Sequence, residues 1–315
     1  MEGGAGTAPA GGAAGHADPL YARGVALVLL AGSFWSLGGL FVRLIDAADA
    51  WQIILYRSLA LVASLLLLIA LRSEGRITRA FARAGWNGLA AGAALAGGFI
   101  GFVLALHLTT VANATFMLGA SPFLAALIGR WLLGEVVRPA TWAAMAIAAA
   151  GVALMVGNGI ALGTGLGNLV ALATAVGFAL FSVLLRRGRE SDMLPCVCHA
   201  GAVSAAVAAL VIGPGLAGSA GFAISEHDLT LCLLMGVVQL AAGLICYTIG
   251  ARHLPAAELL LLSMIELALA PIWVWIAVDE VPSGLTLAGG AVIMSAIAFQ
   301  ALSGARRRRL AIGPV

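Results

Sequence analysis

Three charged side chains lie inside long apolar stretches of this 315-residue chain: Arg57, Glu258 and Glu266. An ionised group at the centre of a bilayer costs roughly 2.5–3.5 kcal/mol, so such residues usually face a cavity or a partner. An Arg in that position can bind a carboxylate or phosphate group, and a Glu can exchange a proton or bind a cation. The three residues therefore predict ion binding and proton exchange in an apolar surrounding.

Glu266 is the strongest candidate of the three. In a cavity of low dielectric constant its neutral form is favoured, whereas a nearby cation favours the anion. A proton and a cationic ligand group would therefore compete for this carboxylate. The alternative is a structural role, in which Glu266 holds helices together through a salt bridge or a hydrogen bond.

Arg57 and Glu258 each have two interpretations. Arg57 either binds an anionic group of a ligand or extends toward the outer interface beside Trp51 and Tyr56. Glu258 lies about one turn from the predicted cytoplasmic boundary, which favours capping or gating over ligand contact. Arg57 and Glu266 differ in depth by only about 5 Å, so a contact between them is a further alternative.

Neutral polar residues in the apolar stretches are weaker candidates for the wall of a cavity: Gln239, Trp35 and Ser36. A Gln in such a position also forms interhelical hydrogen bonds. Trp35 either stacks on an aromatic or cationic ligand or fills the core.

Pro122 and Pro271 fall inside two of the apolar stretches. Each Pro removes a helical hydrogen bond and predicts a bend in its helix. The bends are either hinges or static features of the helices around a cavity.

The composition excludes a soluble protein. Hydrophobic residues make up 62% of the chain and charged residues only 10%, against roughly 45–50% and 25% in soluble domains. A net charge of +3, with basic residues scattered over short segments, argues against a nucleic-acid binder. An integral membrane protein with several transmembrane helices remains.

The cysteines do not predict a metal site. Cys196, Cys198 and His199 are close in sequence, but only Cys196 and His199 would share a helix face. No second Cys or His pair stands nearby to complete a tetrahedral set. We therefore expect no metal and no cofactor.

Apolar segments long enough to cross a hydrocarbon layer of about 30 Å recur along the whole chain. We predict ten transmembrane helices, with these bounds: 24–44, 50–71, 86–107, 112–133, 139–157, 164–185, 195–214, 229–250, 256–278 and 284–303.

The distribution of Arg predicts the orientation of these helices. All 17 basic residues are Arg, and Arg is retained on the cytoplasmic side during insertion. With the N-terminus inside, 15 of the 17 fall in cytoplasmic segments, and Arg43 is one of the two exceptions. The pattern predicts that both termini are cytoplasmic. The exclusive use of Arg indicates GC-rich codons and a bacterial inner-membrane protein.

The chain also has an internal regularity. An offset of 145 residues places Glu135-Val136 on Glu280-Val281, and in each case an apolar helix precedes the pair and another follows it. Repeats of five helices are inverted relative to each other, which is a common construction of secondary transporters. We predict four parts: 1–19, a disordered Gly/Ala-rich cytoplasmic tail; 20–157, the first repeat; 158–304, the second repeat; and 305–315, a basic cytoplasmic tail.

On these features the chain resembles the EamA-type, ten-helix members of the drug/metabolite transporter superfamily. The resemblance rests on the five-plus-five layout, the motif Ser33–Ser36, and the fourth helix with Pro122 that ends in Gly134-Glu135. The ninth helix ends similarly in Asp279-Glu280, although Glu266 stands near the position expected for its Pro. The resemblance implies two inverted EamA repeats around a central cavity lined mainly by helices 1, 3, 4, 6, 8 and 9.

The resemblance implies a secondary active transporter that moves a small metabolite by alternating access and uses no ATP. An amino acid, an organic acid or an amine is the expected solute, and export is the expected direction. Coupling to protons through Glu266 is a separate hypothesis from the residue itself. The alternatives are an uptake carrier for a vitamin or nucleoside-like solute, and a flippase for a lipid or lipid-linked sugar. We expect no enzymatic activity, because no nucleophile stands beside a recognisable base. Monomer and homodimer are both compatible with the sequence.

Overall fold

A computed structural model of the protein describes most of the chain. The described ranges are 19–73, 76–137, 139–161, 163–187, 193–218, 221–250, 253 and 262–311. Over the first half the helices are α1 (Pro19–Leu44), α2 (Ala50–Arg72), α3 (Ile77–Leu108), α4 (Val111–Leu118), α5 (Ser121–Leu133) and α6 (Pro139–Ala161). Over the second half they are α7 (Gly165–Arg187), α8 (Met193–Ile212), η1 (Leu216–Gly218), α9 (Glu226–Leu234), η2 (Met235–Ala242), α10 (Gly243–Gly250), α12 (Ile265–Val278) and α13 (Gly284–Ala311).

The all-helical membrane fold expected from composition is confirmed. Eight helical segments of the described residues are long and apolar enough to cross a membrane, and two shorter apolar helices, Ile265–Val278 and Gly284–Phe299, follow them. The first eight agree with the predicted spans to within a few residues, apart from an extension of α3. That extension, residues 77–84, is separated from the rest of α3 by Gly85, whose φ of 55° lies in the left-handed region.

The fourth predicted span is broken into two helices. α4 ends at Leu118 and α5 begins at Ser121, because Pro122 lacks an N–H and its ring clashes with the carbonyl four residues earlier. The Ser121 hydroxyl donates to that carbonyl, Leu118 O, at 2.7 Å. Gly119 and Ala120 form tight turns to the third residue before each of them. The bend predicted at Pro122 takes the form of a break between two short helices, and Pro122 lies in the first turn of the second one.

The eighth and ninth spans are also irregular. The eighth contains a π-helical segment, η2, between α9 and α10. In the ninth, residues 262–263 are helical, Met264 forms a turn and α12 begins at Ile265, while residues 254–261 lie outside the described part. Pro271 lies inside α12, as predicted from the sequence.

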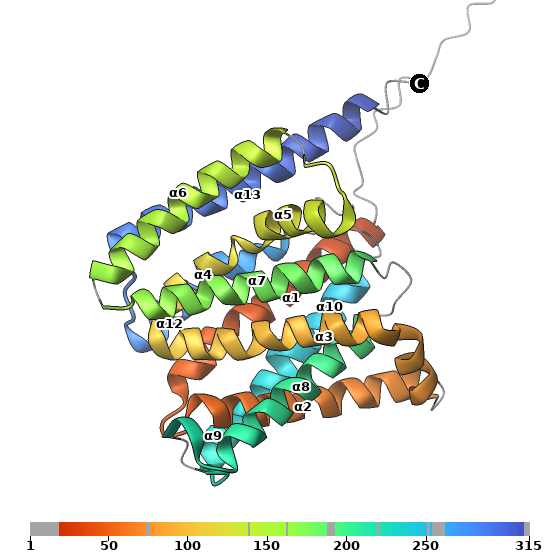
Figure 1. The fold of residues 1–315 in the computed structure, drawn as a ribbon, viewed down its shortest axis with the longest axis vertical. Helices are drawn as coiled ribbons and strands as arrows, with labels where there is room; N and C mark the ends of the chain where they lie inside the picture. The colour runs from red at the N-terminus through yellow and green to blue at the C-terminus, as the bar shows by residue number, and fades with distance from the viewer. Residues whose placement is uncertain are drawn as a thin grey trace, which may run out of the picture.

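The helices pack in layers (Figure 1). α6 packs on α13 at one edge, and α2 packs on α8 at the other. Between them, α3 packs on α7, and α1 packs on α10 and α12. α13 ends at the same end of the bundle at which α1 begins (Figure 1). We name this the inner end, and the opposite end, which carries the loop 45–49, the outer end, following the orientation that the Arg pattern predicts.

Candidate functional site

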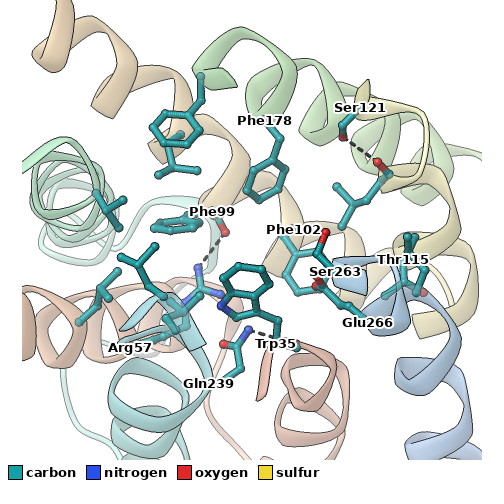
Figure 2. Close-up of a pocket in the computed structure, with 18 of the residues that line it drawn as sticks. Trp35, Arg57, Phe99, Phe102, Thr115, Ser121, Phe178, Gln239, Ser263 and Glu266 are labelled. Atoms are coloured by element: carbon teal, nitrogen blue, oxygen red, sulfur yellow. Dashed lines mark hydrogen bonds between the residues drawn. The ribbon is translucent and has the colours of Figure 1, made fainter. Parts of the chain in front are cut away.

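A cavity of about 310 Å³ lies among the central helices (Figure 2). Side chains from the predicted spans 1, 3, 4, 6, 8 and 9 line it, and spans 2 and 7 contribute as well. The lining is mostly apolar, with a few polar groups at defined positions. This combination is typical of small-molecule sites, whose volumes run from about 300 to 1,000 Å³.

Arg57 lines the cavity from α2 and is 1% exposed. Its Nη2 donates to the carbonyl oxygen of Phe99 at 2.9 Å, and its guanidinium lies over the Phe99 ring, 5.5 Å from the centroid. The buried Nε has no hydrogen-bond partner, and no acidic side chain among the described residues pairs with Arg57. The extension of Arg57 toward the interface is therefore excluded. A buried cation with unused donors is left in the wall.

Gln239 reaches the same cavity from the π-helical segment η2. Its Nε2 donates to the carbonyl oxygen of Trp35 at 3.3 Å, while its buried Oε1 has no partner. π-Helical turns are rare and occur frequently at functional sites. Here η2 crosses α2 closely, because Gly236 has no side chain to collide with the backbone at Arg57. This crossing brings Gln239 and Arg57 to one part of the cavity (Figure 2).

Trp35 extends from α1 into the middle of the site (Figure 2). Its indole packs against Tyr247 with a centroid separation of 5.2 Å. It also lies directly over Gly243, where a Cβ atom would overlap the indole Nε1 and Cδ1. The position of Trp35 thus depends on the absence of a side chain at residue 243.

We expect Gly243→Ala to lower the melting temperature of the purified protein, because overpacking costs about 1–3 kcal/mol. Gly97→Ala is the matched control, since no atom lies within 4 Å of its added Cβ. In that open position the change should be neutral or slightly stabilising, because Ala is the better helix former. Equal melting temperatures for the two variants would contradict the contact.

Glu266 lines the cavity in the first turn of α12. The turn before α12 places this helix N-terminus inside the span, and the positive end of the helix dipole favours an anionic side chain there. No ion pair or hydrogen bond joins the Glu266 carboxylate to another described residue. It is therefore available to a proton or to a ligand in the cavity.

Arg57 and Glu266 line the same cavity without forming an ion pair with each other. In Figure 2 they lie on different sides of the site, and Trp35 stands between them. The alternative of a direct contact is thus not realised in this structure. The cavity instead has a basic side chain on one side and an acidic side chain on the other.

Two further predicted site residues are not part of this arrangement. Ser36 is buried but faces α12, where its hydroxyl accepts a hydrogen bond from Trp273 Nε1 at 2.8 Å. Adjacent residues on a helix point about 100° apart, so Ser36 cannot share the direction of Trp35. The expectation that Ser36 lines the cavity is wrong. Glu258 lies outside the described residues.

The sequence interpretation missed most of the apolar wall. Phe99, Phe102, Phe178 and Phe181 face the cavity, with Phe99 and Phe178 in an edge-on contact at 6.3 Å. Phe99 and Phe102 are three residues apart, and this spacing on one helix face was the available signal.

The sequence interpretation also missed three polar wall residues: Thr115, Ser121 and Ser263. Small hydroxyl residues in apolar helices give no comparable signal, because they also bond to their own backbone.

One cluster of potential metal ligands occurs among the described residues: Asp46, His227 and Asp228 at the outer end. Buried Asp228 accepts hydrogen bonds from the backbone N–H groups of Asp46, Ala47 and Ala48 at 2.9–3.0 Å. These bonds fix the loop between α1 and α2 and occupy the carboxylate. The cluster is thus explained as a loop cap.

Comparisons with known proteins indicate a membrane transporter. Residues 22–157 match the EamA-like transporter family. A Vibrio cholerae protein named as an uncharacterized transporter is 24% identical over 243 residues, which is 75% of this chain and 78% of that protein. A protein crystal structure superposes with a TM-score of 0.62 at 22% identity, over 89% of this chain and 97% of that chain. This last likeness shows the fold alone.

Proposed function

We propose that this chain, residues 22–157 of which match the EamA-like transporter family, is a secondary transporter that moves a small solute by alternating access. The observation that carries the proposal is the central cavity, in which Arg57 has no acidic partner among the described residues and Glu266 has no cationic one. Buried charges without partners are costly, so a protein retains them where a ligand pairs with them.

The packing pattern supports an arrangement of two inverted repeats, 20–157 and 158–304. If the two halves are repeats, α6 of the first corresponds to α13 of the second, and α2 corresponds to α8. The members of each of these pairs are in contact. In the same way α1 corresponds to α7 and α3 corresponds to α10. The contact of α3 with α7 is therefore equivalent to the contact of α10 with α1, and both contacts are present. A substrate site at the interface of such repeats is the common design of secondary transporters.

The chemistry of the cavity favours a zwitterion with an apolar body, which is the character of an apolar amino acid. Its carboxylate would bind the free donors of Arg57, which suit a planar oxoanion. Its ammonium group would bind Glu266 on the other side of Trp35, and its side chain would pack against the Phe rings. A solute with only one of these charges leaves the opposite protein charge unpaired.

Proton-coupled export is the direction that Glu266 supports. A carboxylate that binds either an ammonium group or a proton, but not both, exchanges one for the other on opposite sides of the membrane. In a cell whose exterior is more acidic, inward proton movement would then drive the solute outward. The coupling requires that only one ligand occupies Glu266 at a time.

A matched set of three solutes tests this proposal. We expect purified protein in liposomes to exchange radiolabelled phenylalanine against unlabelled phenylalanine. Its analogues 3-phenylpropanoate and 2-phenylethylamine, which lack the ammonium and the carboxylate respectively, should compete at least about tenfold more weakly, because each leaves a buried charge unpaired. Equal competition by one analogue would contradict the zwitterion. The absence of exchange for any apolar amino acid would contradict the proposed substrate class.

A further inference from the structure

Arg43 stands at the end of α1 and is an exception to the predicted cytoplasmic placement of Arg. Its Nε donates to Glu280 Oε2 at 2.5 Å. Its Nη1 donates to the carbonyl oxygen of Leu106, and its Nη2 to that of Thr109 at 2.9 Å. One guanidinium thus joins the outer ends of α1 and α3 to the segment that follows α12.

Glu280 uses both carboxylate oxygens for contacts with the first half of the chain. Oε2 pairs with Arg43, and Oε1 accepts the backbone N–H of Val111, the first residue of α4, at 2.6 Å. Asp279 ends α12 with a φ of 54°, the left-handed conformation that turns the chain at this point. The outer end of α12 is therefore attached to α1 and α4 through Glu280, and to the end of α3 through Arg43.

The Arg43–Glu280 pair lies on the outer side of the cavity and is not part of its wall. In the opposite direction the cavity extends to Val197, the fifth residue of α8, which begins at the inner end. At about 1.5 Å per residue, Val197 is only about 6 Å along the helix from that beginning. Thr115, one turn along α4 from Val111, also lines the cavity, so the Arg43–Glu280 pair stands about one helical turn beyond the outer limit of the wall.

A second set of polar contacts, more deeply buried than the pair, also joins the two halves. Thr109 donates to Asn168 at 2.9 Å, and Thr286 donates to Asn113 at 2.8 Å. These four side chains are buried, whereas the Arg43 and Glu280 side chains are 25% and 18% exposed. Water therefore reaches the ion pair first, and separation of the halves from outside begins with it.

We propose that the Arg43–Glu280 pair is the latch of the outer gate. The latch holds the outer end of α12 against α3 and α4, and its release opens the cavity to the outer side. The inference rests on alternating access as proposed above, but its test requires no substrate. A charge-assisted pair that is partly exposed is suited to this role, because it can exchange its bonds for bonds to water.

The test measures from which side the cavity can be reached. Leu118, a wall residue on α4, is changed to Cys as the reporter. Cys246→Ala removes the half-buried native cysteine, and the other three, which are buried, form the background measured without the reporter. Modification by a charged, membrane-impermeant thiol reagent is timed in right-side-out and inside-out vesicles.

In the reporter protein we expect slow modification from outside and faster modification from inside. Arg43→Gln and Glu280→Gln should each raise the outside rate at least about tenfold, as expected for loss of one charge-assisted pair, and lower the inside rate. The double variant should open little further than the single variants, because each of them already removes the ion pair between Arg43 and Glu280. Asp279→Asn is the matched control: it removes a charge from the adjacent residue, and Asn tolerates the left-handed conformation.

Two results would overturn the latch. Outside rates in Arg43→Gln and Glu280→Gln equal to that of Asp279→Asn would show that the pair does not close the gate. Modification rates raised from both sides would show that the pair stabilises the whole fold and does not specifically close the outer side of the cavity. Failure of the protein to exchange any amino acid would overturn the proposed substrate and would leave these accessibility measurements valid.

Discussion

Arg57→Gln is expected to reduce phenylalanine exchange by about 30-fold or more while leaving the protein as stable as the parent. Removing one partner of a buried, hydrogen-bonded charge pair costs about 2–5 kcal/mol of binding, and each 1.4 kcal/mol is tenfold. The stability should not fall comparably, because no acidic side chain among the described residues balances Arg57 in the empty cavity. Relief of an unpaired buried charge offsets the lost hydrogen bond to Phe99. Exchange rates in liposomes and the melting temperature measure the two effects separately.

Two further variants make this prediction specific. Arg57→Lys keeps the charge but lacks the planar set of donors, so it should recover only part of the binding. Arg72→Gln, at the exposed end of the same helix, is the matched control and should exchange phenylalanine normally. If Arg57→Gln lowered the melting temperature strongly and exchange in proportion, Arg57 would be a structural residue and the proposed anion site would be wrong.

The fold was predictable because its main determinants are visible in the linear sequence. The length of an apolar segment and the position of Arg relative to it suffice to place a helix across a membrane. The irregular points were harder. A Pro disrupts the turn that precedes it, so the break in the fourth span falls at Gly119 and Ala120, before Pro122. The π-helical segment η2 gave no sequence signal, because it depends on packing against α2.

Residues of the cavity wall were predictable where a charged or polar side chain is unfavourable in contact with lipid. Arg57, Glu266 and Gln239 were selected on that basis, and all three line the cavity. The aromatic wall was not selected, because a Phe facing a cavity and a Phe in the core have the same sequence pattern. The Arg43–Glu280 pair joins residues 237 positions apart. Such a pairing requires the tertiary structure.

Glu266→Gln is expected to abolish the pH dependence of phenylalanine exchange without abolishing the exchange. On the proposed mechanism, protons compete with the ammonium group for Glu266 in the parent, so the apparent affinity should fall as the pH falls, by up to about tenfold per pH unit while this carboxylate titrates. A Gln does not titrate, so the affinity of the variant should be lower at high pH and constant across the range. KM measured between acidic and alkaline pH in liposomes checks the prediction.

The matched variants separate coupling from a general effect of charge. Glu266→Asp keeps a titrating group in the cavity, so the pH dependence should persist with weaker binding caused by the shorter side chain. Glu226→Gln removes an exposed carboxylate in the first turn of α9, outside the cavity wall, and should preserve the pH profile of the parent. An unchanged profile in Glu266→Gln would show that protons act elsewhere. It would remove the physical basis for proton-coupled export, because no other carboxylate of the described residues lines the cavity.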